Sequence, residues 1–422
     1  MSVTKITGRF IEALRWADWL SRDRITAWGL MLLVAELLLS LFIALWQHGV
    51  FTRTVGPHSI DFLSFYAAGK LALTGAPQLA YDQAAHYLAE QHIAGTAAPY
   101  QFFFYPPVFL LLCAALAKLP YLASYVVFQL AGMVGFVLAM RPILRRSDWH
   151  WVLPVLAFPA VIWSIGLGQN APLTAGLLAC FTVLIDKRPI AAGLMLGLLC
   201  YKPHFGLLMP IALIAGQRWR TFFAAGATVV TVVLLSRLVY GWETWAAYLT
   251  AFGGSHNVYA SGRIDYAKMI SLFGGARLLG FDAAQAYAVQ GVAAVAMACL
   301  LAVTWRHPVS QPVRNAMLLT TTLLAVPVAL IYDQLLLIVA AGWLTREARA
   351  TGYLPWERLC LIAIYPMALL AWPIGTAWHV PLGCAGPAVI LLLCLRRSWS
   401  ALAMRNRPAP ISGGAQPAGA IP

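Results

Sequence analysis

Residues 26–47 read TAWGLMLLVAELLLSLFIALWQ, an almost unbroken apolar run with a single charged residue, Glu36. A helix needs about 20 consecutive apolar residues to cross about 30 Å of hydrocarbon. Similar runs recur along most of the chain, in which 61% of the 422 residues are apolar and only 10% are charged. In an ordinary soluble domain about 45–50% of the residues are apolar and about 25% are charged. The composition therefore excludes a soluble globular protein and predicts an all-α, polytopic membrane protein.

The apolar runs predict a bundle of about 10–12 transmembrane helices. They lie near residues 26–47, 121–141, 150–167, 171–185, 189–201, 204–216, 220–239, 283–304, 313–331, 334–346, 357–373 and 376–395. Residues 106–118 are a further apolar run, but a crossing there would place Arg141, Arg145 and Arg146 outside, whereas cytoplasmic loops collect Lys and Arg. We therefore expect residues 106–118 to be interfacial or re-entrant.

The formal net charge of +14 is explained by basic cytoplasmic loops, so we expect no nucleic acid partner. With the N-terminus inside, residues 1–25 form a cytoplasmic basic segment and residues 26–400 form a single transmembrane domain. Within this domain, residues 48–120 form an extracytoplasmic interfacial region and residues 240–282 a second one. Residues 401–422, rich in Pro, Gly and Ala, are expected to be a disordered cytoplasmic tail.

Asp61 is the most informative acid, because it follows the first apolar run and precedes Phe62, Phe65 and Tyr66 at the start of an apolar-faced helix. We expect amphipathic surface helices over residues 61–95. One interpretation of Asp61 is an N-cap, since a carboxylate at a helix start accepts hydrogen bonds from free backbone N–H groups. A carboxylate at a membrane surface can also accept a proton from a bound hydroxyl, so cap and catalyst are compatible.

Lys202 and His204 interrupt an otherwise apolar hairpin in the stretch LLCYKPHFGLL. A Lys at membrane depth is costly and usually marks a site or a water-filled cavity. Alternatively, Pro203 breaks the helix and puts the turn at the outer surface, where a Lys side chain snorkels to water. The stretch GLGQNAPL similarly offers Gln169 and Asn170, either as site groups or as plain helix caps.

The polar stretch SHNVYASGRIDYAK holds His256, Arg263 and Lys268 between two apolar runs. A solvated loop is one interpretation. The other is a phosphate site, because two cations on the outer side run against the charge trend. Tyr332 and Asp333 break a further pair of apolar runs, where a buried Asp is either hydrogen-bonded structure or part of a site.

Two classes of function fit these features. The chain has no signature of a soluble catalytic site, and its seven cysteines lack paired or metal-ligand spacing. The first class is an enzyme that acts on a lipid-borne substrate, and the second is a transporter or flippase for an amphipathic lipid. Transporters usually place charges near the bilayer centre and carry inverted repeats. Charges gathered at one surface favour the enzyme.

The order of several motifs resembles that of the family 87 glycosyltransferases of the GT-C superfamily, over about residues 26–345. The motifs are DFLSFYAAGKLALTGAPQLAYD, FFFYPPVFLLL followed by KLP, GLGQNAPL, and AAGLMLGLLCYKPHFGLLMP. The family includes mannosyltransferases that extend phosphatidylinositol mannosides. The resemblance implies a GT-C-type helical bundle, a polyprenyl-phosphate sugar donor, and a catalytic base in the first extracytoplasmic loop. That base matches Asp61, although many GT-C enzymes carry a paired acid where this chain has Phe62.

The resemblance implies transfer of a hexose, with mannose as the first candidate, to a lipid-linked or cell-envelope glycan with inversion. A lipid phosphate is already an acceptable leaving group, so the reaction needs a base and cations rather than a strong acid. We expect Asp61 as the base. The expected donor-phosphate ligands are Lys202, Arg263 and Lys268, and the expected pocket groups are His204, His256, Gln169, Asn170, Tyr332 and Asp333.

No metal-binding cluster and no resident cofactor are expected from the residues, although the resemblance allows a divalent cation shared by the donor phosphate and Asp61. Membrane lipids, the sugar donor and a glycolipid or glycan acceptor are the expected partners. We expect an integral multi-pass protein of a bacterial plasma membrane, with its active site on the extracytoplasmic face.

Overall fold

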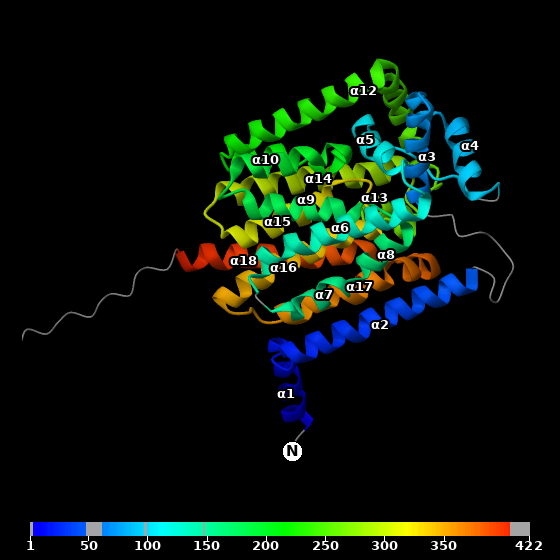
Figure 1. The fold of residues 1–422 in the computed structure, drawn as a ribbon. Coiled ribbons are helices and arrows are strands. Elements are labelled where there is room, and N and C mark those ends of the chain that lie inside the picture. The colour runs from blue at the N-terminus through cyan, green and yellow to red at the C-terminus, as the bar shows by residue number, and fades with distance from the viewer. Residues whose placement is uncertain (1–2, 48–60, 97–98, 147, 406–422) are drawn as a thin grey trace, which may run out of the picture.

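The computed structural model describes residues 3–47, 61–96, 99–146 and 148–405. This part of the chain consists of α-helices joined by short 3-10 helices and turns, and it contains no strand (Figure 1). The expected all-α class is confirmed. The expected interfacial stretch before Asp61, residues 48–60, and the tail from residue 406 onward lie outside the described residues. Residues 401–405, expected to be disordered, instead continue the last helix.

Six helices of the described chain are long and apolar enough to cross a membrane, which confirms the polytopic membrane architecture. They are α2 (Arg22–Gln47), α6 (Tyr121–Leu144), α12 (Trp219–Ala260), α14 (Ala283–Arg306), α17 (Glu357–Trp378) and α18 (Ala385–Arg405). A bent pair, Trp149–Leu156 and Pro159–Leu167, adds a seventh if its two arms form one broken span. The arms meet at a bend of 65°.

The remaining apolar runs form shorter helices. They are α9 (Ala171–Leu184), α10 (Pro189–Leu198), α11 (Met209–Ala215), α15 (Gln311–Ala325) and α16 (Leu335–Thr351). Two of them lie inside the bundle, because α15 is buried from Asn315 to Ala325 and α16 from Leu335 to Leu344. The number of long helices is therefore lower than the hydropathy predicted, because apolar side chains fill the protein interior as well as the membrane.

Three short helices gather at one end of the bundle, beside the bend of α12 (Figure 1). They are α3 (Phe62–Leu73), α4 (Gln83–Ala94) and α5 (Pro107–Leu116). α5 has 10 residues, too few for a crossing, as expected for residues 106–118. α3 is buried on all sides from Phe62 to Gly69, so the prediction of an amphipathic surface helix is wrong for it.

Close contact between α3 and α5 explains this burial. A Cβ atom added at Gly69 of α3 would lie 2.2 Å from the Cys113 carbonyl oxygen and 2.9 Å from the Ala117 Cβ. Only a residue without a side chain allows the two backbones to approach so closely. The start of α3 is consequently held inside the protein instead of lying on a membrane surface.

The second expected interfacial region begins as a helix. α12 passes the expected boundary at residue 239 and bends at Gly241, where φ is 76°. It then continues to Ala260, followed by a turn and the short helix α13 (Leu272–Leu278). The prediction of a polar loop over SHNVYASGRIDYAK is therefore wrong for its first residues, which belong to α12.

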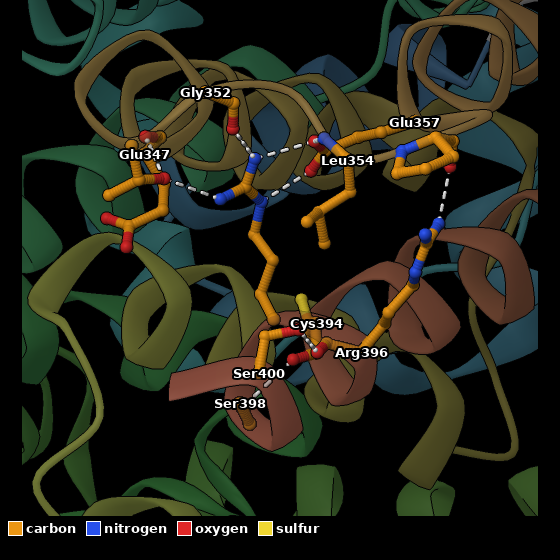
Figure 2. Close-up of polar contacts among 11 residues, drawn as sticks. Glu347, Gly352, Leu354, Glu357, Cys394, Arg396, Ser398 and Ser400 are labelled. Carbon is orange, nitrogen blue, oxygen red and sulfur yellow. Dashed lines mark hydrogen bonds and ion pairs between the residues drawn. The ribbon is translucent and has the colours of Figure 1, made fainter. Parts of the chain in front are cut away.

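A buried ion pair joins α17 to α18. Arg397 binds both carboxylate oxygens of Glu357, at 2.5 and 2.6 Å, and also donates to Thr351 Oγ1 and the Gly352 carbonyl oxygen. Figure 2 shows Gly352, Leu354 and Glu357 around this contact. The Leu354 N–H donates to Glu357 Oε2 at 2.8 Å. Because every partner is satisfied, the two charges are tolerated in a buried position.

We expect Arg397→Met to destabilise the protein by about 3–5 kcal/mol, because it leaves the Glu357 carboxylate buried without its cation. The measurement is the midpoint of thermal unfolding of the purified protein in detergent. Arg396→Met is the matched control, since Arg396 is exposed and donates only to the Pro355 carbonyl oxygen among the described contacts. Equal midpoints for the two variants would show that the buried ion pair does not stabilise the fold.

Candidate active site

Four segments meet at the start of α3 and carry most of the expected site residues. Asp61 precedes α3, and Gln169 and Asn170 lie in the turn between α8 (Pro159–Leu167) and α9. Lys202 lies between two 3-10 helices, and Asp333 lies in a third. These 3-10 helices are η3 (Leu199–Tyr201), η4 (Pro203–Gly206) and η6 (Ile331–Gln334). The site is thus built where apolar helices break.

Asp61 occupies the N-cap position of α3, but its side chain does not cap the helix. Gln169 Nε2 instead donates to Asp61 Oδ2 at 2.5 Å. Gln169 is itself held in place, because Gln129 Nε2 donates to its carbonyl oxygen at 3.1 Å. The Tyr105 hydroxyl donates to Gln169 Oε1 at 3.5 Å. The N-cap interpretation is therefore wrong for the carboxylate, which is oriented by Gln169.

Gly168 allows the Gln169 turn to approach Asp61. Its φ of 70° lies in the left-handed region, and a Cβ atom there would lie 2.6 Å from the Phe62 Cβ. Both conditions require glycine. The turn therefore packs directly against the first residue of α3, at the distance that the Gln169 to Asp61 hydrogen bond needs.

Lys202 and Asp333 form a buried ion pair. The Lys202 Nζ lies 2.9 Å from Asp333 Oδ1, and the two residues are 3% and 4% exposed. The ammonium also lies over the rings of Tyr332 and Phe205, at 5.4 and 5.5 Å from their centres. Asp333 Oδ2 accepts from the Leu330 N–H at 3.0 Å. The interpretation of Lys202 as a surface residue that snorkels to water is wrong.

The Asp61 carboxyl lies within electrostatic reach of two lysines. Burial raises the pKa of Asp61 above its ordinary value, while the Gln169 hydrogen bond and the charges of Lys268 and Lys202 lower it. Lys268 ends η5 (Tyr266–Lys268), a short 3-10 helix after α12, with its ammonium 4.4 Å from the centre of the Trp372 ring. One carboxylate is therefore influenced by the charges of two lysines.

The remaining expected residues differ in their positions. His204 lies in η4, two residues after Lys202, and its ring contacts that of Phe205 with centres 4.5 Å apart. His256 and Arg263 are exposed. His256 Nδ1 lies 2.8 Å from the Gly253 carbonyl oxygen of its own helix, and His256 has no described contact with Asp61. Arg263 has no described polar contact with Asp61 or Lys202.

A second buried pair, missed in the sequence, lies on α4. His86 and Glu90 are both fully buried, with His86 Nδ1 3.7 Å from Glu90 Oε1. His86 Nε2 lies 3.1 Å from the Ser64 carbonyl oxygen, and Glu90 Oε2 accepts from the Gln101 N–H at 3.0 Å. These contacts tie α4 to α3 near Asp61. The spacing of four residues was the only signal in the sequence.

Burial decides the charges of this pair. It raises the pKa of Glu90 to about 8, with a smaller contribution from the negative charge of Asp61. It lowers the pKa of His86 to about 4. Both side chains are therefore neutral in the folded protein near pH 7.

The arrangement around Asp61 combines one carboxylate that can accept a proton with cations that can hold an anion. Among the residues that the structure describes, no group of three or more His, Cys, Asp or Glu side chains could hold a metal ion. Whether a cation is shared with a bound substrate stays a prediction.

Comparison with known proteins gives one match. A model of glycosyltransferase family 87 matches residues 103–331, just over half of the chain. The match contains Gln169, Asn170 and Lys202, whereas Asp61 and Asp333 lie outside it. No curated protein and no solved structure matches the chain.

The pKa of Glu90 predicts a pH dependence of stability. Its carboxyl titrates at its ordinary value of 4.5 when unfolded and at about 8 when folded, so its contribution is present below pH 4.5 and lost as the pH rises to about 8. His86 acts in the opposite direction, losing stability as the pH falls from 6.5 to about 4. We expect the thermal midpoint to fall between pH 6.5 and 8, where, of this pair, only Glu90 exchanges a proton.

Glu90→Gln should flatten this decline, because glutamine carries no proton to lose. The control is Glu243→Gln, which changes an exposed glutamate of α12 in the same way and should leave the decline as in the wild type. A decline that persists in Glu90→Gln would assign it to another group.

Proposed function

This chain belongs to glycosyltransferase family 87 and is a membrane glycosyltransferase, and on that premise we propose the reaction that it performs. The proposed donor is a polyprenyl-phosphate sugar, with mannose as the first candidate hexose. The proposed acceptor is a lipid-linked or cell-envelope glycan. Membership of the family favours an enzyme over the transporter or flippase that the composition also allowed.

The observation that carries the proposal is the Gln169 to Asp61 hydrogen bond beside the Lys202–Asp333 ion pair. An acceptor hydroxyl attacks the anomeric carbon while Asp61 takes its proton. The bond between that carbon and the phosphate oxygen breaks, and its electron pair leaves with the phosphate. One displacement from the face opposite the phosphate inverts the configuration. Gln169 orients the Asp61 carboxylate for the proton transfer.

Lys202 and Lys268 are the proposed ligands of the departing phosphate. A Lys ammonium has three N–H donors, and Asp333 occupies only one of those of Lys202. The charge that develops on the phosphate oxygen can therefore bind the remaining donors. Arg263, which is exposed between α12 and η5, is a third proposed ligand. His204, His256, Asn170, Tyr332 and Asp333 are proposed pocket groups.

The proposed active site faces the extracytoplasmic side of a bacterial plasma membrane. α6 begins at Tyr121, whose ring centre lies 5.6 Å from that of Phe62, the residue next to Asp61. It ends before Arg145 and Arg146, which the charge trend assigns to the cytoplasm. Its 24 residues correspond to about 36 Å of helix, about the thickness of a membrane.

The test is sugar transfer by the purified protein in lipid, supplied with radiolabelled polyprenyl-phosphate sugars and a membrane lipid extract. We expect Asp61→Asn to lower the rate by about 10²–10⁴-fold, because it removes the base, while donor binding is retained. The control is Asp82→Asn, since asparagine preserves the N-cap that Asp82 provides for α4.

Three outcomes would contradict parts of the proposal. Equal transfer by wild type and Asp61→Asn would exclude Asp61 as the base. No consumption or binding of any donor would exclude the donor class. Retention of configuration, read from the anomeric NMR signal of the product, would exclude direct displacement.

A separate test adds a chelator of divalent cations to the assay. Loss of sugar transfer in its presence would support a divalent cation shared with the donor phosphate.

The pH profile of kcat/KM provides a second test. The Gln169 hydrogen bond lowers the pKa of Asp61, so Gln169→Leu should raise this pKa. Since only ionised Asp61 can accept a proton, the acidic limb of the profile should move to higher pH. Lys202→Met should move it in the same direction, and Asp82→Asn should leave it in place. A limb that stays in place in both site variants would show that it does not report Asp61.

A further inference from the structure

A cavity of about 710 Å³ lies at the end of the bundle opposite the candidate active site. α6 starts beside Phe62, and Met140 and Leu144 near its other end line the cavity. α16 begins two residues after Asp333, and Arg349 in its last turn lines the same cavity. Two helices thus connect the site to the cavity across the bundle, so the cavity lies at the other membrane face.

The wall of the cavity is largely apolar. It lies between α2 and the helices behind it, with Leu32, Val155, Ile338 and Leu361 among its side chains. α2 packs mainly on α7 (Val152–Leu156), and most of its apolar side chains are not buried by the rest of the protein. The space behind α2 therefore has the character of a membrane interior.

The polar end of the cavity is basic. Arg22, Arg146, Arg349 and Arg358 line it, and each lies at or beside the end of a helix. The Asp148 carboxylate binds two of them, with its Oδ1 2.8 Å from a guanidinium nitrogen of Arg22 and its Oδ2 2.9 Å from one of Arg146. Asp18 forms an ion pair with Arg358. Arg349 has no carboxylate partner among the described residues and donates to the Leu144 carbonyl oxygen at 3.3 Å. Four guanidinium groups therefore face only two carboxylates.

We propose that this cavity binds an anionic phospholipid of the surrounding leaflet, with its phosphate on the arginines and an acyl chain along the apolar wall behind α2. Guanidinium groups match phosphate geometry and charge. Basic pockets between transmembrane helices on the cytoplasmic side are suited to anionic head groups. A bound lipid fills the space behind α2 and holds this helix on the bundle. The proposal does not depend on the chemistry at Asp61.

The test uses the full-length protein purified in a zwitterionic detergent and titrated with phosphatidylglycerol or with phosphatidylcholine of the same acyl chains. Native mass spectrometry measures the bound lipid. We expect saturable binding of phosphatidylglycerol alone, weakened about tenfold by Arg349→Gln, which removes one charged hydrogen-bond donor. Arg188→Gln is the control, because Arg188 is exposed and does not line the cavity. It should bind lipid as the wild type does.

A second variant tests the acyl chain. Thr345 lines the cavity, and Thr345→Trp should obstruct it and abolish binding while all four arginines remain. In addition, phosphatidylglycerol should raise the thermal midpoint of the wild type but not of Arg349→Gln. Equal binding of the two lipids, unchanged binding by Arg349→Gln, or a shift of the midpoint by inorganic phosphate equal to that by the lipid would overturn the proposal.

Discussion

A charge enclosed by apolar helices needs a partner, because its desolvation cost is otherwise larger than any gain from packing. Two buried ion pairs obey this constraint at opposite ends of the bundle, Lys202–Asp333 beside the candidate active site and Arg397–Glu357 between α17 and α18. Each joins segments far apart in the sequence. The two ion pairs therefore hold these segments together, and the apolar helices pack around them.

The same constraint explains why the site lies at helix breaks. Helices of an apolar bundle satisfy their own backbone, so polar side chains and free backbone groups gather where helices end. Gly168 brings one such turn against Phe62, and the Leu330 N–H is satisfied by Asp333. Asp61 obtains its partner from the α8–α9 turn rather than from its own helix. Close packing at Gly69 keeps α3 in the position this requires.

The two ends of the bundle present different chemistry. At one end the half-buried Asp61 carboxylate accepts a hydrogen bond from an amide and lies within electrostatic reach of two lysines. At the other, excess arginines line the polar end of an apolar cavity. α6 and α16 extend from one end to the other. The same two helices therefore line the cavity behind α2 and reach the candidate active site.

The sequence by itself determined the all-α membrane class and the order of the motifs, because apolar runs and their length are local properties. It also indicated Lys202 and Asp333, since a charged residue that interrupts apolar runs has a cost that needs a reason. Asp61 and Gln169 were indicated by their positions at the starts of apolar helices. Only the tertiary structure decided which of these residues pair. It also decided that α3 is buried. It decided as well that only some of the apolar runs form helices long enough to cross a membrane. Burial and pairing depend on neighbours distant in the chain, and apolar side chains suit a protein interior and a lipid phase equally.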